Sequence, residues 1–292
     1  MIYDIKHVTT YSYPSQVSYA RCALRLKPLS GAGQTLQSHG VDIRPRPSER
    51  NARVDFFGIE IETVLIDTPH RLLKIESRSR VDVDRHPPAR DAASPQWERI
   101  CEAAVDAATF DASSPVNYVF ASSLTPIQPD ITAYALTSFT PGRGVLEGAV
   151  ELMRRVYTDF KYDPKATVIS TPLAEVFEKR HGVCQDFAHV MISGLRGIGL
   201  PAAYVSGYLR TIPPPGQPRL EGADASHAWV AVWCGEAMGW VGLDPTNDIV
   251  VANHHIELAV GRDFADVSPV DGMIVGSRRQ KLAVAVDVLL VE

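Results

Sequence analysis

The sequence predicts an α+β protein in which an all-β N-terminal region precedes helices packed on an antiparallel sheet or barrel. Two observations lead to this prediction. Apolar residues alternate with polar ones through most of the first 83 residues and again from residue 202, whereas the segment between them has apolar residues at helical spacing. The order of strands, helices and strands also differs from the regular β-α-β alternation of parallel sheets.

The N-terminal region, residues 1–85, contains three predicted strands at 3–11, 56–66 and 72–83. They are rich in β-branched and aromatic residues and show period-2 alternation, which is typical of half-buried strands. Proline and glycine residues separate them. We therefore expect a small antiparallel sheet or sandwich here.

Residues 86–142 are predicted to connect this region to a second one. The stretch 86–95 is rich in proline and alanine, and a short helix is expected to start at Ser94-Pro95. The remainder holds many Ser, Thr and Pro residues, which predict loops with one short helix near 130–139.

Residues 143–292 are predicted to form the catalytic core and to end in a strand. Helices are expected from Gly144 to Phe160, over 171–180 and over 183–198, because apolar residues recur there at 3.6 spacing. Strands are expected at 202–209, 226–234, 239–243 and 280–291, with a proline-rich surface loop at 213–218.

The composition narrows the class of protein. The chain has 292 residues, 45% of them apolar, and a net charge of −5. It lacks a basic run, a signal-peptide pattern and an apolar stretch of about 20 residues, so we expect no nucleic-acid partner, no membrane span and a cytoplasmic location. The four cysteines are scattered without a CxxC pair, which indicates reduced thiols and no zinc site.

One cysteine stands where a catalytic thiol would be expected. Cys184 begins a predicted helix, directly after His181-Gly182. The dipole and free N–H groups of a helix N-terminus favour the thiolate, as does a nearby imidazolium, and a backbone amide of that turn could hold an oxyanion.

A base and an orienting acid follow later in the chain. His227 lies in a predicted strand, where it can face a site while alternate residues fill a core. Asp244 ends the next strand, directly before Pro245. The short loop between the strands predicts a hairpin, which would place the carboxylate beside the imidazole.

These segments resemble a known family. Gly182-Val183-Cys184-Gln185-Asp186, Ser226-His227-Ala228-Trp229 and Asp244-Pro245-Thr246-Asn247 are similar to the motifs of the transglutaminase-like superfamily, and of its bacterial transglutaminase-like cysteine proteases in particular. The resemblance covers nearly the whole chain. It implies a papain/transglutaminase-like core behind an N-terminal β domain, with Cys184 as nucleophile, His227 as base and Asp244 as orienting residue.

Other residues are weaker candidates for binding substrate or an oxyanion: Gln185, Asp186, Trp229 and Tyr162. Asp186 could instead act only as a favourable charge at the helix start, and Trp229 could be core. His189 is expected to be packed or partly buried. The pair His254-His255 is interpreted as a solvated loop, since no third metal ligand stands at suitable spacing.

We therefore expect a cysteine peptidase or amidase that forms a thioester on Cys184 and hydrolyses it, with peptide, protein or amide substrates and no cofactor. Two alternatives stay open. An amine could replace water, which gives a transglutaminase-type acyltransferase, or the fold could serve as a non-enzymatic binding module. The oligomeric state, a homo-oligomer included, stays open.

Overall fold

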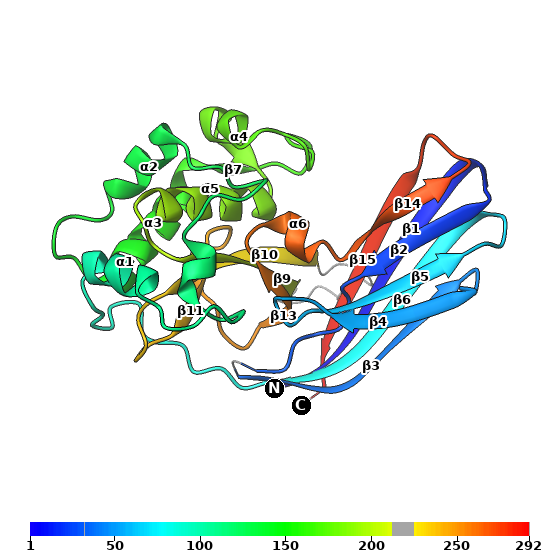
Figure 1. Ribbon diagram of the computed structural model, residues 1–292, viewed down its shortest axis with the longest axis horizontal. Helices are drawn as coiled ribbons and strands as arrows, with labels where there is room; N and C mark the ends of the chain where they lie inside the picture. The colour runs from blue at the N-terminus through cyan, green and yellow to red at the C-terminus, as the bar shows by residue number, and fades with distance from the viewer. Residues whose placement is uncertain (32, 212–224, 292) are drawn as a thin grey trace, which may run out of the picture.

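The computed structural model describes residues 1–31, 33–211 and 225–291, and it confirms the α+β class. One half of the molecule contains the helices, which pack on an antiparallel sheet whose strands differ in length. The other half consists of long strands (Figure 1). The proline-rich loop expected at 213–218 lies outside the described residues.

The N-terminal half is a sandwich of two four-stranded sheets with orders β15-β1-β6-β3 and β14-β2-β5-β4. Apolar side chains of both sheets, such as Val17, Ile66 and Leu73, are buried between them. The strands are β1 (Ile2–Val17), β2 (Tyr19–Leu24), β3 (Gln34–Arg44), β4 (Glu49–Val54), β5 (Glu60–Ile66), β6 (His70–Val83), β14 (Val270–Val275) and β15 (Lys281–Leu290).

Two features of this sandwich differ from the sequence expectation. β2, β3 and β4 lie where no strand was predicted, and all six residues of β4 are exposed, so that strand has no buried face to produce an alternating pattern. The predicted C-terminal strand exists as β15, but it pairs with β1 along the N-terminal sheet rather than with the core. Both ends of the chain therefore lie in one sheet (Figure 1).

The core half has a five-stranded sheet of order β12-β11-β10-β9-β13. β10 and β11 are antiparallel neighbours, as the predicted hairpin requires. The strands are β9 (Ala202–Leu209), β10 (Ala225–Trp233), β11 (Trp240–Asp244), β12 (Ile249–Val250) and β13 (His255–Gly261). A short parallel pair joins β7 (Lys161–Tyr162) to β8 (His181–Gly182).

The helices gather around α5, which packs on β9 and β10 and contacts α2, α3 and α4. They are α1 (Trp97–Val105), α2 (Pro129–Leu136), α3 (Val145–Asp159), α4 (Leu173–Lys179), α5 (Cys184–Gly197) and α6 (Phe264–Val267), with a 3₁₀ turn η1 (Pro115–Tyr118). The predicted helices over 144–160, 171–180 and 183–198 are thus confirmed. Within the described ranges, no helix has both the length and the apolar character that crossing a membrane requires.

A buried arginine joins the connector to the core. Arg196, at the end of α5, is 2% exposed. Its guanidinium donates to the carbonyl oxygens of Tyr118, Ala202 and Arg262 at 3.0, 2.8 and 2.7 Å, and to the Thr125 hydroxyl at 2.8 Å. Three chain segments that are distant in sequence thereby share one cation.

We predict that Arg196→Met lowers the free energy of unfolding by about 3–5 kcal/mol, because it leaves several buried acceptors without donors. Urea denaturation followed by circular dichroism measures the change. The control is Arg99→Met on α1, an exposed position where we expect a change of about 0.5 kcal/mol or less. Equal effects of the two substitutions would contradict the proposed role of Arg196.

Candidate active site

Cys184 is the first residue of α5, and the segment before it is built to start a helix there. Val183 is extended, and its N–H donates to Asp186 Oδ2 at 2.8 Å, while the Thr167 hydroxyl donates to the same oxygen at 2.6 Å. A Cβ on Gly182 would lie 2.5 Å from that oxygen, so only glycine leaves room for the cap. The first-turn N–H groups beside Cys184 have no partners within the helix.

His227 lies between the thiol and a carboxylate. Its Nε2 atom is 2.8 Å from Asp244 Oδ2, and its side chain also hydrogen-bonds with that of Cys184. Since Nε2 faces Asp244, the nitrogen left for the thiol is Nδ1. The three residues proposed from the sequence are thus brought together.

The electrostatics of this group favour a charged imidazole. Burial by itself would lower the pKa of His227, but the hydrogen bonds with Asp244 and Cys184 and their negative charges raise it well above its usual value. Burial likewise opposes ionisation of Asp244, yet the hydrogen bonds from His227, His255 and Asn247 hold the pKa of this carboxyl below its usual range. The site therefore stabilises the charged form of the His227 imidazole beside the Asp244 carboxylate.

Asp244 is fully buried, and donors from several elements surround it. Besides His227, its Oδ2 atom is 2.7 Å from Asn247 Nδ2 and 3.2 Å from His255 Nε2, and its Oδ1 atom accepts from the Thr246 N–H at 2.9 Å. These contacts hold the carboxylate in one orientation toward His227.

His255 corrects a sequence expectation. The pair His254-His255 was interpreted as a solvated loop, but His255 opens β13 and is 1% exposed. β13 lies at the edge of the core sheet next to β9. This position places the Nε2 atom of His255 3.2 Å from Asp244 Oδ2. Burial lowers the pKa of His255, so it donates to Asp244 as a neutral ring.

His227, Asp244 and His255 also offer three possible metal-ligand atoms within 4.8 Å of one another. A metal ion would need the same Nε2 and Oδ2 atoms that form the two histidine–aspartate hydrogen bonds. Hydrogen bonding already accounts for the arrangement, and we assign no metal to it.

The four weaker candidates lie in different places. Gln185 lines a cleft of about 260 Å³ together with Cys184 and His227. Asp186 caps the helix as described above. Trp229 is fully buried behind the site, with its ring 5.1 Å from that of His255, and it does not line this cleft. Tyr162 is 52% exposed and packs edge-to-face on Phe187 beside the cleft.

Sequence reasoning missed several residues of the cleft. Tyr204 on β9 lines it and packs on His189, whose buried Nε2 atom accepts from the Phe264 N–H at 3.3 Å. His7 and Thr9 on β1 line it from the sandwich side. The spacing of Tyr204 in its strand is a weak signal, and nothing in the local sequence of β1 connects it with Cys184.

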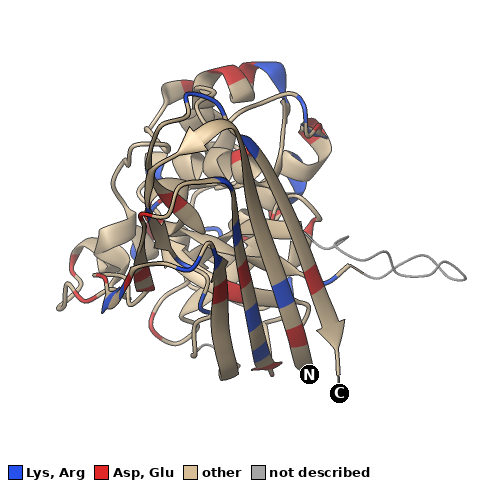
Figure 2. Cartoon of the chain, turned by 90° about the vertical axis from the view of Figure 1, so that its right-hand side faces the viewer, with Lys and Arg blue, Asp and Glu red and all other residues tan. Residues whose placement is uncertain are grey.

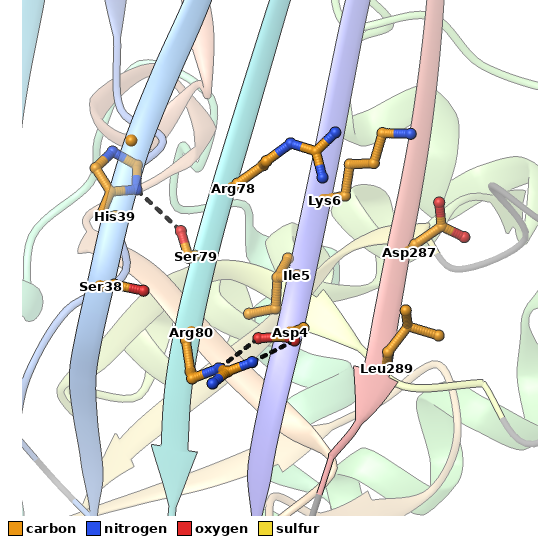
Figure 3. A pocket seen from close by; sticks show the side chains of 11 residues that line it. Asp4, Ile5, Lys6, Ser38, His39, Arg78, Ser79, Arg80, Asp287 and Leu289 are labelled. Carbon is orange, nitrogen blue, oxygen red and sulfur yellow. Dashed lines mark hydrogen bonds and ion pairs between the residues drawn. The ribbon is translucent and has the colours of Figure 1, made fainter.

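A larger hollow, of about 830 Å³, lies on the outer face of the β15-β1-β6-β3 sheet (Figure 3), and none of its described lining residues lines the cleft at Cys184. Arg80 forms a two-pronged ion pair with Asp4, with both distances 2.7 Å, and His39 Nδ1 is 2.9 Å from the Ser79 hydroxyl. Cations and anions are interspersed along these strands (Figure 2). This pattern is typical of a solvated sheet face, and no cysteine in the described part of the chain lines the hollow.

Comparison with known proteins agrees with this geometry. Residues 3–82 match the bacterial transglutaminase-like N-terminal region, and residues 133–245, which include Cys184, His227 and Asp244, match the transglutaminase-like superfamily. An uncharacterized protein of Mycobacterium tuberculosis H37Rv is 39% identical over 98% of this chain and 92% of its own length. A protein-glutamine gamma-glutamyltransferase of Pseudomonas aeruginosa is 33% identical over 98 residues, which are 31% of this chain and 14% of that protein.

A solved structure described as a "Putative Cysteine Protease from Cytophaga hutchinsonii" has the same fold. It superimposes with a TM-score of 0.75 and covers 100% of this chain and 92% of its own. At 19% sequence identity, this likeness concerns the fold alone.

We predict that Asp244→Asn lowers the pKa of His227, because it removes the buried negative charge that favours the imidazolium. NMR titration of the His227 ring measures the midpoint, which lies above 6.5 in the wild type and moves downward in the variant. Asp248→Asn is the control, since Asp248 pairs with Arg90 instead. A midpoint that is the same in Asp244→Asn and wild type would refute the assigned ion pair.

Proposed function

Because the chain belongs to the transglutaminase-like superfamily, we propose that it is a thiol-dependent hydrolase of peptide or carboxamide bonds that works through Cys184, His227 and Asp244. The observation that supports this most is the position of His227, which bonds to the thiol on one side and to a buried carboxylate on the other. A thiol–imidazole pair oriented by a third group is the arrangement that nucleophilic catalysis needs.

The reaction begins when the Cys184 thiolate attacks the carbonyl carbon of the substrate. A C–S bond forms, and the electron pair of the carbonyl moves onto oxygen. The backbone N–H groups in the first turn of α5 and the neighbouring Gln185 are the donors that we assign to this oxyanion.

His227 then donates its proton to the leaving nitrogen, the C–N bond breaks, and an amine or ammonia departs. Asp244 keeps the imidazole ring oriented and stabilises its charged form. In the second half of the reaction, His227 takes a proton from water as the water attacks the thioester. The C–S bond then breaks, which regenerates the Cys184 thiolate and releases the carboxylic acid product.

The alternative is acyl transfer, in which an amine attacks the same thioester. It is favoured by the similarity of 98 residues to a protein named as a protein-glutamine gamma-glutamyltransferase. Incubation with a glutamine-containing peptide and a labelled primary amine separates the two. The hydrolase predicts released ammonia or peptide fragments without incorporated label, whereas a stable labelled amide would establish the transferase.

The second alternative is a binding module without activity. It predicts that Cys184 is no more reactive than Cys101, a half-buried thiol whose pKa burial and the charge of Glu98 raise to about 11. Under our proposal, iodoacetamide at neutral pH labels Cys184 first, and peptide mass spectrometry of the folded protein reads the order.

The proposal includes peptide, protein or amide substrates and a cytoplasmic location. The location rests on the four cysteines, which are all free thiols and thus suit a reducing compartment.

We predict that Cys184→Ala lowers hydrolysis of a responsive peptide or amide substrate by a factor on the order of 10⁴ or more, because the thioester can no longer form. A peptide and amide library screened with both proteins identifies the substrate and measures the loss. Cys101→Ala is the matched control and retains wild-type turnover. Undiminished turnover in folded Cys184→Ala would disprove the assignment of the nucleophile.

A further inference from the structure

We propose that the N-terminal sandwich forms one wall of the active-site cleft, and that this wall selects an uncharged, apolar side chain next to the amide attacked by Cys184. The inference rests on the proposed function and deepens it to a substrate class. It follows from the lining of the cleft, the exposure of two side chains in it, and its charge and size.

The cleft has two sides that come from different halves of the molecule. The core supplies Cys184, Gln185 and His227. The sandwich supplies side chains of two paired strands, β1 and β15, that line the same cleft: Thr9, Tyr11, Leu282 and Val284. A substrate held at Cys184 therefore lies against the sandwich sheet.

The inner face of β15 changes character along its length. Val286 and Val288 are each 1% exposed and pack in the same cluster as the core half. Leu282 and Val284 belong to the same face, because alternate residues of a strand share a side, yet they are 52% and 47% exposed. These two side chains extend past the core contact into the cleft, where a substrate side chain can bury them.

Apart from the cationic ring of His227, whose charge is paired with the buried Asp244 carboxylate, the described residues of the cleft offer no partner for a charged substrate group. Among the described residues that line it, none is Lys, Arg, Asp or Glu. His7 is buried and neutral: burial lowers its pKa to about 4, and its two ring nitrogens contact the Tyr208 and Thr9 hydroxyls at 2.9 and 3.1 Å. A carboxylate or ammonium next to the scissile amide would lose hydration without gaining an ion pair.

The size of the cleft limits recognition to one position. Its volume of about 260 Å³ is smaller than the pockets that enclose whole drug-sized ligands, which start at about 300 Å³. It can hold the reacting amide and one flanking side chain. We therefore expect selectivity for that side chain and tolerance of the residues beyond it.

The test measures alkylation of Cys184 by chloroacetamides whose nitrogen carries a benzyl, a carboxymethyl or an aminoethyl group, with iodoacetamide as the small reference. Each rate is normalised to the reaction of the same reagent with a free thiol in solution. We expect the benzyl reagent to react about tenfold faster than the two charged reagents. Equal normalised rates in the wild type would overturn the proposal.

Two variants locate the selectivity. Leu282→Glu is expected to remove the preference for the benzyl reagent and to favour the aminoethyl reagent. Leu289→Glu is the matched control, because Leu289 lies on the same strand with 49% exposure but lines the outer hollow (Figure 3). It should leave the preference unchanged, and an equal loss in both variants would contradict the assigned wall.

The iodoacetamide reference separates this inference from the proposed function. Fast labelling of Cys184 by iodoacetamide with no difference among the chloroacetamides would overturn the wall and keep the activated thiol. Slow labelling, at the rate of Cys101, would instead count against the proposed function itself. A selective series together with slow iodoacetamide labelling would support the wall and reject the enzyme.

Discussion

The buried carboxylate of Asp244 imposes the constraint on which the site depends. An ionised group with no exposure to water is stable only when donors replace its hydration. Here the donors come from β10, from β13 and from the turn that follows β11. These strands must therefore meet in one arrangement around the two carboxylate oxygens of Asp244. The orientation of His227 toward Cys184 is a consequence of this packing, and His255 contributes to it from a strand that carries no other reacting group.

The helix that carries the Cys184 thiol, α5, is held in place by contacts at both of its ends. Asp186 caps its start, the missing side chain of Gly182 leaves room for that cap, and Arg196 binds its far end to the connector and to the turn after β13. α5 is thus fixed at both ends while its middle packs on β9 and β10. The Cys184 thiol, at the N-terminus of this helix, therefore has a defined position relative to the sheet that carries His227.

The role of the N-terminal half follows from the path of the chain ends. β1 and β15 pair over ten residues, and their inner face meets the core at one end and the second sheet of the sandwich at the other. The cleft opens along the part of this face that lies between its contact with the core and its contact with the second sheet. The sandwich therefore contributes side chains to the cleft that contains Cys184.

The sequence by itself determined the class of fold, the principal helices and the three residues of the proposed mechanism, because these depend on local periodicity, on a helix start and on motifs with a characteristic spacing. It did not reveal β4, whose residues are all exposed, nor the partner of the final strand. The pair His254-His255 was assigned to a solvated loop because no third metal ligand stands at suitable spacing in the sequence, and only the order of the core sheet placed His255 against Asp244. The wall formed by Thr9 and Leu282 likewise required the tertiary structure, since the alternation that predicts each of these strands does not show which strand pairs with it.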